Sequence, residues 1–224
     1  MNVIREFFNV NTVAFTVLGY PLSYLELFGT LFNVWSVWLV IKRRIATWPI
    51  GIIGVLLFLV LFYQIQLYAD TLEQVYYLGA SVYGWWLWAK TSEPSADQPT
   101  NVRYSSPRSS AIVGGVTVVL GLLLGYITSQ LHVWMPRWFA VAASYPYIDA
   151  LTTLMSFTAT LLLARKRIEC WVYWILVDVV GIWLYYVKDV KFIALLYCVF
   201  LVMAVSGLLA WRTQRATVSA LAPD

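Results

Sequence analysis

Seven stretches of the chain consist almost entirely of apolar residues, and polar residues gather in the segments between them. An α-helix rises about 1.5 Å per residue, so roughly 20 apolar residues cross the roughly 30 Å hydrocarbon core of a bilayer. Each stretch has about this length. We therefore predict seven transmembrane helices, over residues 24–41, 46–64, 71–89, 111–129, 145–164, 169–187 and 192–211.

The composition agrees with a chain whose main solvent is lipid. Of its 224 residues, 61% are hydrophobic and 12% are charged, against roughly 45–50% and about 25% in soluble domains. This balance excludes a water-soluble globule. The net charge of +4 does not indicate a nucleic-acid partner, because the lysines and arginines lie in short clusters between the apolar stretches. The expected partner is the lipid bilayer, and the expected class is an all-α integral membrane protein.

The segments before, between and after the predicted helices differ in character. Residues 1–22 are expected at the outer surface, and for their apolar stretch, residues 12–20, a surface-lying helix and an additional short span are both open alternatives. Residues 90–110 are rich in Ser, Pro and other polar residues and have no apolar period, which predicts a flexible loop outside the membrane. Residues 212–224 form a tail after the last helix.

Lysine and arginine are distributed unevenly between the two sides of the predicted helices. The richer side carries eleven of them: Lys42, Arg43, Arg44, Lys90, Arg103, Arg108, Arg165, Lys166, Arg167, Arg212 and Arg215. The other side carries four: Arg5, Arg137, Lys188 and Lys191. Positively charged loops are retained in the cytoplasm. We therefore predict that the N-terminus lies outside and that the C-terminus and the loop at 90–110 are cytoplasmic.

The chain contains an internal repeat. A shift of 123 residues places 24–88 on 147–211 without a gap, and 15 of the 65 aligned positions are identical. Shared aliphatic composition does not explain the identities between Arg44 and Arg167, Trp48 and Trp171, Gly84 and Gly207, and Trp88 and Trp211. The sequence therefore predicts two related units, at residues 23–89 and 145–211.

The repeat predicts how the helices are arranged. Two successive units of three helices would be inverted relative to each other, and the single helix at 111–129 restores the direction of the second unit. The result is a 3+1+3 arrangement with parallel repeats, as in small transporters of the SWEET type. A ligand site is then expected at the repeat interface near the middle of the membrane.

One predicted helix carries an ionisable residue near its centre. Asp178 lies in the stretch 169–187, where a charge costs roughly 2.5–3.5 kcal/mol, so it should face a bundle interior or an aqueous cavity. Trp171, Trp174 and Asp178 are spaced three and four apart, which places two indoles and a carboxylate on one helical face. A planar cation could use all three groups. The alternatives are an interfacial Trp171 and an Asp178 that only pairs with a neighbouring helix.

Other polar residues in the predicted helices are candidates of lower rank. The amide of Gln74 can donate and accept hydrogen bonds, as selective ligand recognition requires, although bonding between helices is an equal alternative. Asn33, Gln64 and Tyr185 are weaker candidates for the same site. Glu26 and Asp149 lie near outer helix ends and fit an interfacial or a functional role.

The sequence offers little for enzyme chemistry. Its only histidine, His132, falls in an outer loop, so neither a histidine-based metal cluster nor a Ser–His pair is expected in the membrane. The sequence contains no P-loop for ATP. We expect no catalytic residues, no metal and no cofactor.

Two strings in the sequence resemble a known family. Residues 48–88 and 167–197, with the tryptophan pair followed by an acid, are similar to the PnuC family of bacterial vitamin transporters. The resemblance covers about residues 22–212. It implies a SWEET-like fold, a homotrimer as a candidate assembly, and uptake of nicotinamide riboside across the inner membrane. Carried over position by position, Trp171 and Trp174 would stack on the ligand, and Asp178 and Gln74 would hydrogen-bond it.

Two positions depart from the nicotinamide riboside pattern of this family. This chain has Cys170 and Asp178 where members often have asparagine. The family also includes thiamine and riboflavin transporters, so several substrates stay open. Nicotinamide riboside, the first expectation, and thiamine, the second, are planar-ring cations that suit two indoles and a carboxylate. A seven-helix sensor that binds the ligand without moving it is the alternative from another class.

Overall fold

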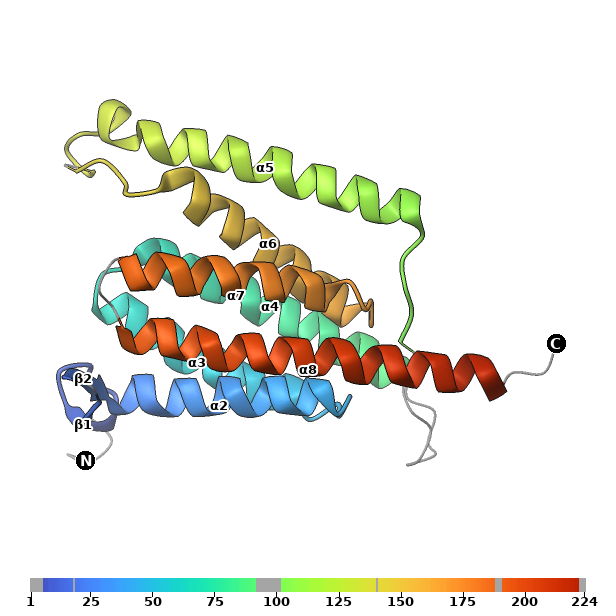
Figure 1. Cartoon of the computed structure of the whole chain (residues 1–224). Helices are drawn as coiled ribbons and strands as arrows, with labels where there is room; N and C mark the ends of the chain where they lie inside the picture. The colour runs from blue at the N-terminus through green and yellow to red at the C-terminus, as the bar shows by residue number, and fades with distance from the viewer. Residues whose placement is uncertain (1–5, 18, 92–101, 140, 188–190, 222–224) are drawn as a thin grey trace.

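Seven long helices run along a common direction in the computed structural model, which describes residues 6–17, 19–91, 102–139, 141–187 and 191–221 (Figure 1). They are α2 (Tyr24–Ile41), α3 (Thr47–Gln64), α4 (Tyr68–Thr91), α5 (Pro107–Trp134), α6 (Pro146–Ala164), α7 (Cys170–Val187) and α8 (Lys191–Leu221). Each predicted helix is present. The largest difference is at α8, which continues ten residues past the predicted end at 211.

Six of the seven helices are long and apolar enough to cross a membrane. The exception is α4, because Asp70, Glu73 and Lys90 lower the mean hydropathy of its 24 residues. This helix packs against α3 on one side and α6 on another. The Glu73 carboxylate accordingly accepts a hydrogen bond from Thr153 of α6, whereas Lys90 is exposed and lies over the Trp86 ring of α4.

The apolar stretch at residues 12–20 lies in a β-hairpin, so in the described residues it forms neither the surface helix nor the short span left open by the sequence. Strands β1 (Val13–Val17) and β2 (Tyr20–Ser23) pair antiparallel. Ser23 then caps α2 by accepting a hydrogen bond from the Glu26 backbone, and the Glu26 carboxylate accepts one from the Ser23 backbone at 2.8 Å. Glu26 also accepts from the Tyr20 hydroxyl at 2.7 Å. Burial and this bond raise the pKa of Tyr20 to about 12, so the hydroxyl remains a donor at neutral pH.

The links α2–α3 and α6–α7 have the same backbone geometry. Arg43 and Lys166, which the shift of 123 aligns, both adopt a left-handed conformation with φ of 54°. In each link the next residue, Arg44 or Arg167, donates a backbone hydrogen bond of 2.9 Å to the carbonyl five residues earlier. The sequence repeat therefore corresponds to a repeat of local structure.

Each repeat unit contains a pair of perpendicular tryptophans. The first lies at the start of the helix after the link, and the second lies in the next helix. The rings of Trp48 and Trp88 lie 5.4 Å apart at 87°, and those of Trp171 and Trp211 lie 5.4 Å apart at 89°. The first ring of each pair packs on a glycine of the third helix, Trp48 on Gly84 and Trp171 on Gly207, where an added Cβ would collide with the indole. The glycines are required because only a bare backbone lets the rigid ring approach so closely.

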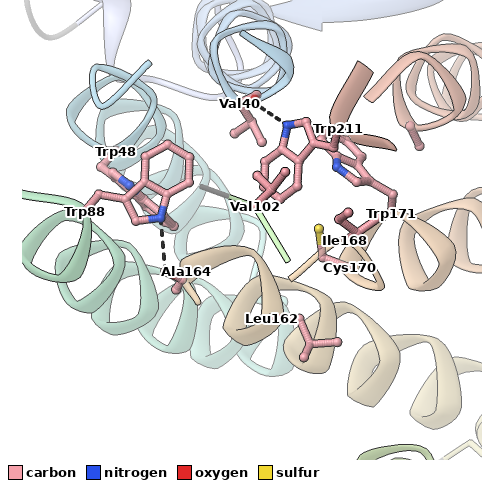
Figure 2. Packing of buried hydrophobic residues seen from close by; sticks show 11 residues of the cluster. Val40, Trp48, Trp88, Val102, Leu162, Ala164, Ile168, Cys170, Trp171 and Trp211 are labelled. Atoms are coloured by element: carbon pink, nitrogen blue, oxygen red, sulfur yellow. Dashed lines mark hydrogen bonds between the residues drawn. The ribbon is translucent and has the colours of Figure 1, made fainter. Parts of the chain in front are cut away.

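The second tryptophan of each pair, Trp88 or Trp211, is hydrogen-bonded to the other half of the protein, where the halves are the two repeat units. The Trp88 indole donates to the Ala164 carbonyl at 3.0 Å, and the Trp211 indole donates to the Val40 carbonyl at 3.2 Å (Figure 2). Both acceptors lie in the last turn of a helix, and the Val40 carbonyl also accepts a hydrogen bond of 2.8 Å from the Arg43 backbone. The helices make matching contacts, since α4 packs on α6 and α8 packs on α2. Helix α5 lies at the edge, against α6 (Figure 1).

The end of the predicted flexible loop is docked on the protein. Residues 92–101 lie outside the described residues. Val102 is 7% exposed and belongs to the buried cluster around Trp48, Trp88, Trp171 and Trp211, which we call the tryptophan cluster. The next residue, Arg103, pairs with Arg167 as a short parallel bridge. Burial of the apolar Val102 side chain stabilises this end of the segment, although its polar composition predicted a flexible loop. We call residues 102–106 the strap.

We expect Gly84→Ala and Gly207→Ala each to destabilise the protein by about 1–3 kcal/mol, the usual cost of overpacking a core. The matched control is Gly79→Ala in the same helix as Gly84, where an added Cβ meets nothing within 4 Å. Thermal unfolding of the purified variants in detergent measures the difference. Equal melting temperatures for Gly84→Ala and Gly79→Ala would contradict the packing described here.

Candidate functional site

Asp178 lies in the middle of α7 and is 4% exposed. Its carboxylate makes no hydrogen bond or ion pair with any residue that the structure describes. A carboxylate so buried is costly unless a partner compensates the lost hydration. Asp178 is therefore the strongest candidate in the described chain for contact with a ligand.

Tyr197 of α8 lies beside the part of α7 that carries Asp178. The ring of Tyr197 in α8 lies over Gly181, one turn from Asp178, where an added Cβ would be 2.5 Å from the ring. Tyr197 interacts electrostatically with Asp178 and with Tyr77 of α4. It also stacks on Tyr185 at a centroid distance of 5.4 Å. Groups from α4, α7 and α8 thus converge near the middle of the bundle.

A second polar group joins α4 to α6 near the N-terminal ends of these helices. The Thr153 hydroxyl donates a hydrogen bond of 2.9 Å to Glu73. Glu73 interacts electrostatically with Asp70 and Asp149 as well as with Tyr197. Three carboxylates therefore lie close together near the ends of α4 and α6. Such a group produces a negative potential that attracts cations.

The α4–α6 contact is reinforced by aromatic rings. Tyr76 stacks on Phe157 with centroids 3.8 Å apart, and its hydroxyl donates to the Phe157 carbonyl at 2.9 Å. Tyr77 meets the same ring edge-on at 5.6 Å. The packing fixes the position of α4 and so of Gln74, which lies between Glu73 and Tyr76 in the sequence.

Gln74 is 9% exposed, and its amide has no hydrogen-bond partner among the described residues. The shift of 123 aligns Gln74 with Tyr197. The two equivalent positions thus carry different polar side chains in the two halves. The carbonyl oxygen and the NH2 group of the Gln74 amide therefore make Gln74 a candidate for ligand contact.

The two tryptophans predicted for the site have different environments. Trp174 is half-buried and packs at the edge of the tryptophan cluster. Trp171 is 2% exposed, enclosed by Trp211 and Gly207. It lies about 10 Å from Asp178 along the helix axis, at about 1.5 Å per residue. Within the described part of the chain, the indole nitrogens of Trp171 and of its counterpart Trp48 have no hydrogen-bond partner.

The weaker candidates divide into two groups. Tyr185 joins the ring cluster beside Asp178, as described above. Gln64 lies at the end of α3, where its amide donates to the Phe8 carbonyl at 2.6 Å and accepts from the Val10 backbone at 3.1 Å. Asn33 donates to the Gly29 carbonyl in its own helix at 2.9 Å and packs on Gly54. Gln64 and Asn33 therefore bond to backbone away from Asp178.

The sequence analysis did not single out Glu73, Tyr77 or Tyr197. Two signals could have found them. Glu73 is a further ionisable residue inside a predicted membrane helix, one position before Gln74. Tyr197 follows from the repeat, because it is aligned with Gln74. Aligning the predicted site residues of one half with the other half therefore identifies Tyr197, one of the three residues that the sequence analysis did not single out.

Comparison with known proteins identifies the family. Residues 23–213 match the family described as nicotinamide mononucleotide transporter. The chain belongs to this family. It is a multi-pass membrane transporter, and the match covers the first six long helices and α8 up to residue 213.

Individual members of the family are similar to the chain over nearly its whole length. The nicotinamide riboside transporter PnuC of Escherichia coli (strain K12) is 28% identical, over 92% of this chain and 94% of that protein. The riboflavin/roseoflavin transporter RibM of Streptomyces davaonensis is 24% identical, over 92% and 93%. A crystal structure of the vitamin B3 transporter PnuC has the same fold, with a TM-score of 0.66 and 21% identity over 87% of this chain and 83% of that one.

The burial difference between the tryptophans predicts different effects of their removal. Trp171→Ala should lower the free energy of unfolding by about 3–5 kcal/mol, as expected for a fully packed core tryptophan. Trp48→Ala should match it, since Trp48 has the same surroundings. Trp174→Ala should cost less because its side chain is half-exposed. Thermal unfolding of the three variants tests this order, and a Trp174→Ala loss as large as that of Trp171→Ala would contradict it.

Proposed function

We propose that the chain imports a cationic B-vitamin by facilitated diffusion across the bacterial inner membrane, with no catalytic step. Nicotinamide riboside is the first candidate and thiamine the second. The observation that carries the proposal is the Asp178 carboxylate, buried in α7 without a hydrogen bond or ion pair in the described chain. A positively charged ring supplies the missing charge partner.

The relatives support this choice of substrate class. The E. coli protein at 28% identity is named for nicotinamide riboside. RibM, at 24% identity, is named for riboflavin, which is neutral and larger. Nicotinamide riboside and thiamine each carry a positive charge on a planar ring. An acidic residue at position 178 favours either cation over riboflavin.

The substrate path that we propose begins at the carboxylates near the ends of α4 and α6. Asp70, Glu73 and Asp149 attract the cation, and Asp178 and Gln74 then bind it. Trp174 stacks against the ring. Trp171 belongs to the buried tryptophan cluster against which Trp174 packs, and this cluster closes the end of the path opposite to the carboxylates. We also propose that Trp171 itself stacks on the ligand.

We further propose the 3+1+3 arrangement with parallel three-helix repeats, in which α5 is the linking helix. The identical hydrogen bonds of the two links and the matching contacts α4–α6 and α8–α2 support it. Because the sequence contains no P-loop, accumulation of the vitamin depends on trapping it inside the cell. The family resemblance suggests trapping by phosphorylation. A non-transporting sensor would bind the same ligand through the same residues.

Binding to the purified protein tests the role of Asp178. We expect nicotinamide riboside or thiamine to bind more tightly than riboflavin. Asp178→Leu should weaken binding of both cations by about tenfold or more, which equals about 1.4 kcal/mol. Asp178→Asn retains the shape, loses the charge and gains a donor, so it should reduce the preference for cations over riboflavin.

The matched control is Val55→Leu, at the position that the repeat aligns with Asp178. It should leave the ranking of the three vitamins unchanged. Titration calorimetry on folded variants, with melting curves as the check on folding, gives the affinities. If all three vitamins bind the two Asp178 variants as they bind the wild type, Asp178 is not part of the site.

Cysteine labelling tests the proposed orientation. Trp138, 82% exposed between α5 and α6, should lie outside, and Arg108 at the start of α5 should lie in the cytoplasm. In a Cys198→Ser background, an impermeant maleimide should react with a Trp138→Cys variant in intact cells. An Arg108→Cys variant should react only after permeabilisation. The reverse pattern would show that the orientation is inverted.

A further inference from the structure

The strap at residues 102–106 is held by backbone and side-chain bonds to the α6–α7 link. The Arg103 backbone donates to the Lys166 carbonyl at 3.1 Å and accepts from the Ile168 backbone at 3.2 Å. The Ser105 backbone donates to the Glu169 carboxylate at 2.6 Å. These are specific contacts between residues more than sixty positions apart, so the strap has a defined place on the molecule.

Tyr104 connects the strap to the extension of α8. Its carbonyl accepts a hydrogen bond from the Arg167 guanidinium at 2.9 Å, and its hydroxyl accepts one from Arg212 at 3.1 Å. The Arg215 guanidinium lies 4.4 Å from the centre of its ring. Because Arg212 and Arg215 follow Trp211, the strap is tied to the helix that carries the second tryptophan pair.

The repeat shows that the fold does not require the strap. The α2–α3 link has the same backbone hydrogen bonds as the α6–α7 link, yet its Ile45 is 37% exposed. The equivalent residue beside the strap, Ile168, is 0% exposed. The link therefore folds with its isoleucine open in one half and covered in the other. The covering strap is an addition to one half of a repeated structure.

Val102 is the residue of the strap that packs where the two halves meet. It belongs to the same buried cluster as Trp48, Trp88, Trp171 and Trp211. In Figure 2 it lies between the two tryptophan pairs, near the bonds from Trp88 to Ala164 and from Trp211 to Val40. Separation of the halves at this end would break both bonds and expose the apolar surface around Val102.

We propose that the strap is a latch that holds the protein closed at the end where the tryptophans lie, and that it must leave before substrate can exit there. This inference rests on the proposed transport function. The latch stabilises the closed state through Val102, which contacts both halves, while its hydrogen bonds attach it to the second half. Its release lowers the cost of separating α2 from α8 and α4 from α6.

Alkylation of a cysteine between the halves tests the latch without any ligand. The reporter is Val40→Cys, because Val40 is 4% exposed at the contact with Trp211. The background carries Cys170→Ser and Cys198→Ser to remove the two native thiols. Val102→Ser, and separately Arg103→Pro, which removes the donor to Lys166, should speed maleimide labelling of the reporter by about tenfold, or about 1.4 kcal/mol in the opening equilibrium.

Two controls make the outcome decisive. A second reporter, Ala150→Cys, lies near the opposite end of α6 and is also buried at 4% exposure, so its labelling should not change. Ile45→Ser alters the link that has no strap and should leave both reporters slow. Unchanged labelling of Val40→Cys, or equal acceleration at both reporters, would overturn the proposal. Labelling needs no vitamin, so failure of the proposed substrate in the binding assay is distinguishable from failure of the latch.

Discussion

Two indole N–H groups, from Trp88 and Trp211, each reach across the protein to a carbonyl at the end of a helix in the other half. Each bond ends on a carbonyl in the last turn of a helix, and the Val40 carbonyl also accepts from the Arg43 backbone at 2.8 Å. Each tryptophan is held in place by a perpendicular partner, which in turn requires a glycine in the third helix. The relative position of the halves, and so of every group between them, depends on this crossed pair of bonds.

The proposed site arises where the two halves differ. The repeat aligns Asp178 with Val55 and Tyr197 with Gln74, so a carboxylate, a phenol and an amide are introduced at positions that are not the same in both units. The tryptophan pairs, the glycines and the turn geometry are shared because both halves need them to pack. The symmetric features thus build the frame, and the asymmetric residues give it the polar centre that we propose as the substrate site.

The sequence predicted the helices because lipid imposes a simple length requirement on apolar segments. It also predicted the repeat and the burial of Asp178, since both follow from the positions of charged residues and tryptophans along the sequence. It did not predict the hairpin before α2, whose strands are too short to show a period. Nor did it predict the docked strap, because a single valine within a polar segment gives no pattern. The distinction between Trp171 and Trp174 depends on neighbours from α8 that are distant in the sequence.

Counterflow of nicotinamide riboside is the most direct test of transport through the centre marked by Asp178. Liposomes containing the purified protein would be loaded with unlabelled nicotinamide riboside and diluted into the radiolabelled compound, without ATP or an ion gradient. The account predicts transient accumulation of label that protein-free liposomes do not show and that Asp178→Leu strongly reduces. Binding of nicotinamide riboside and thiamine with no counterflow of either would contradict it and indicate a sensor.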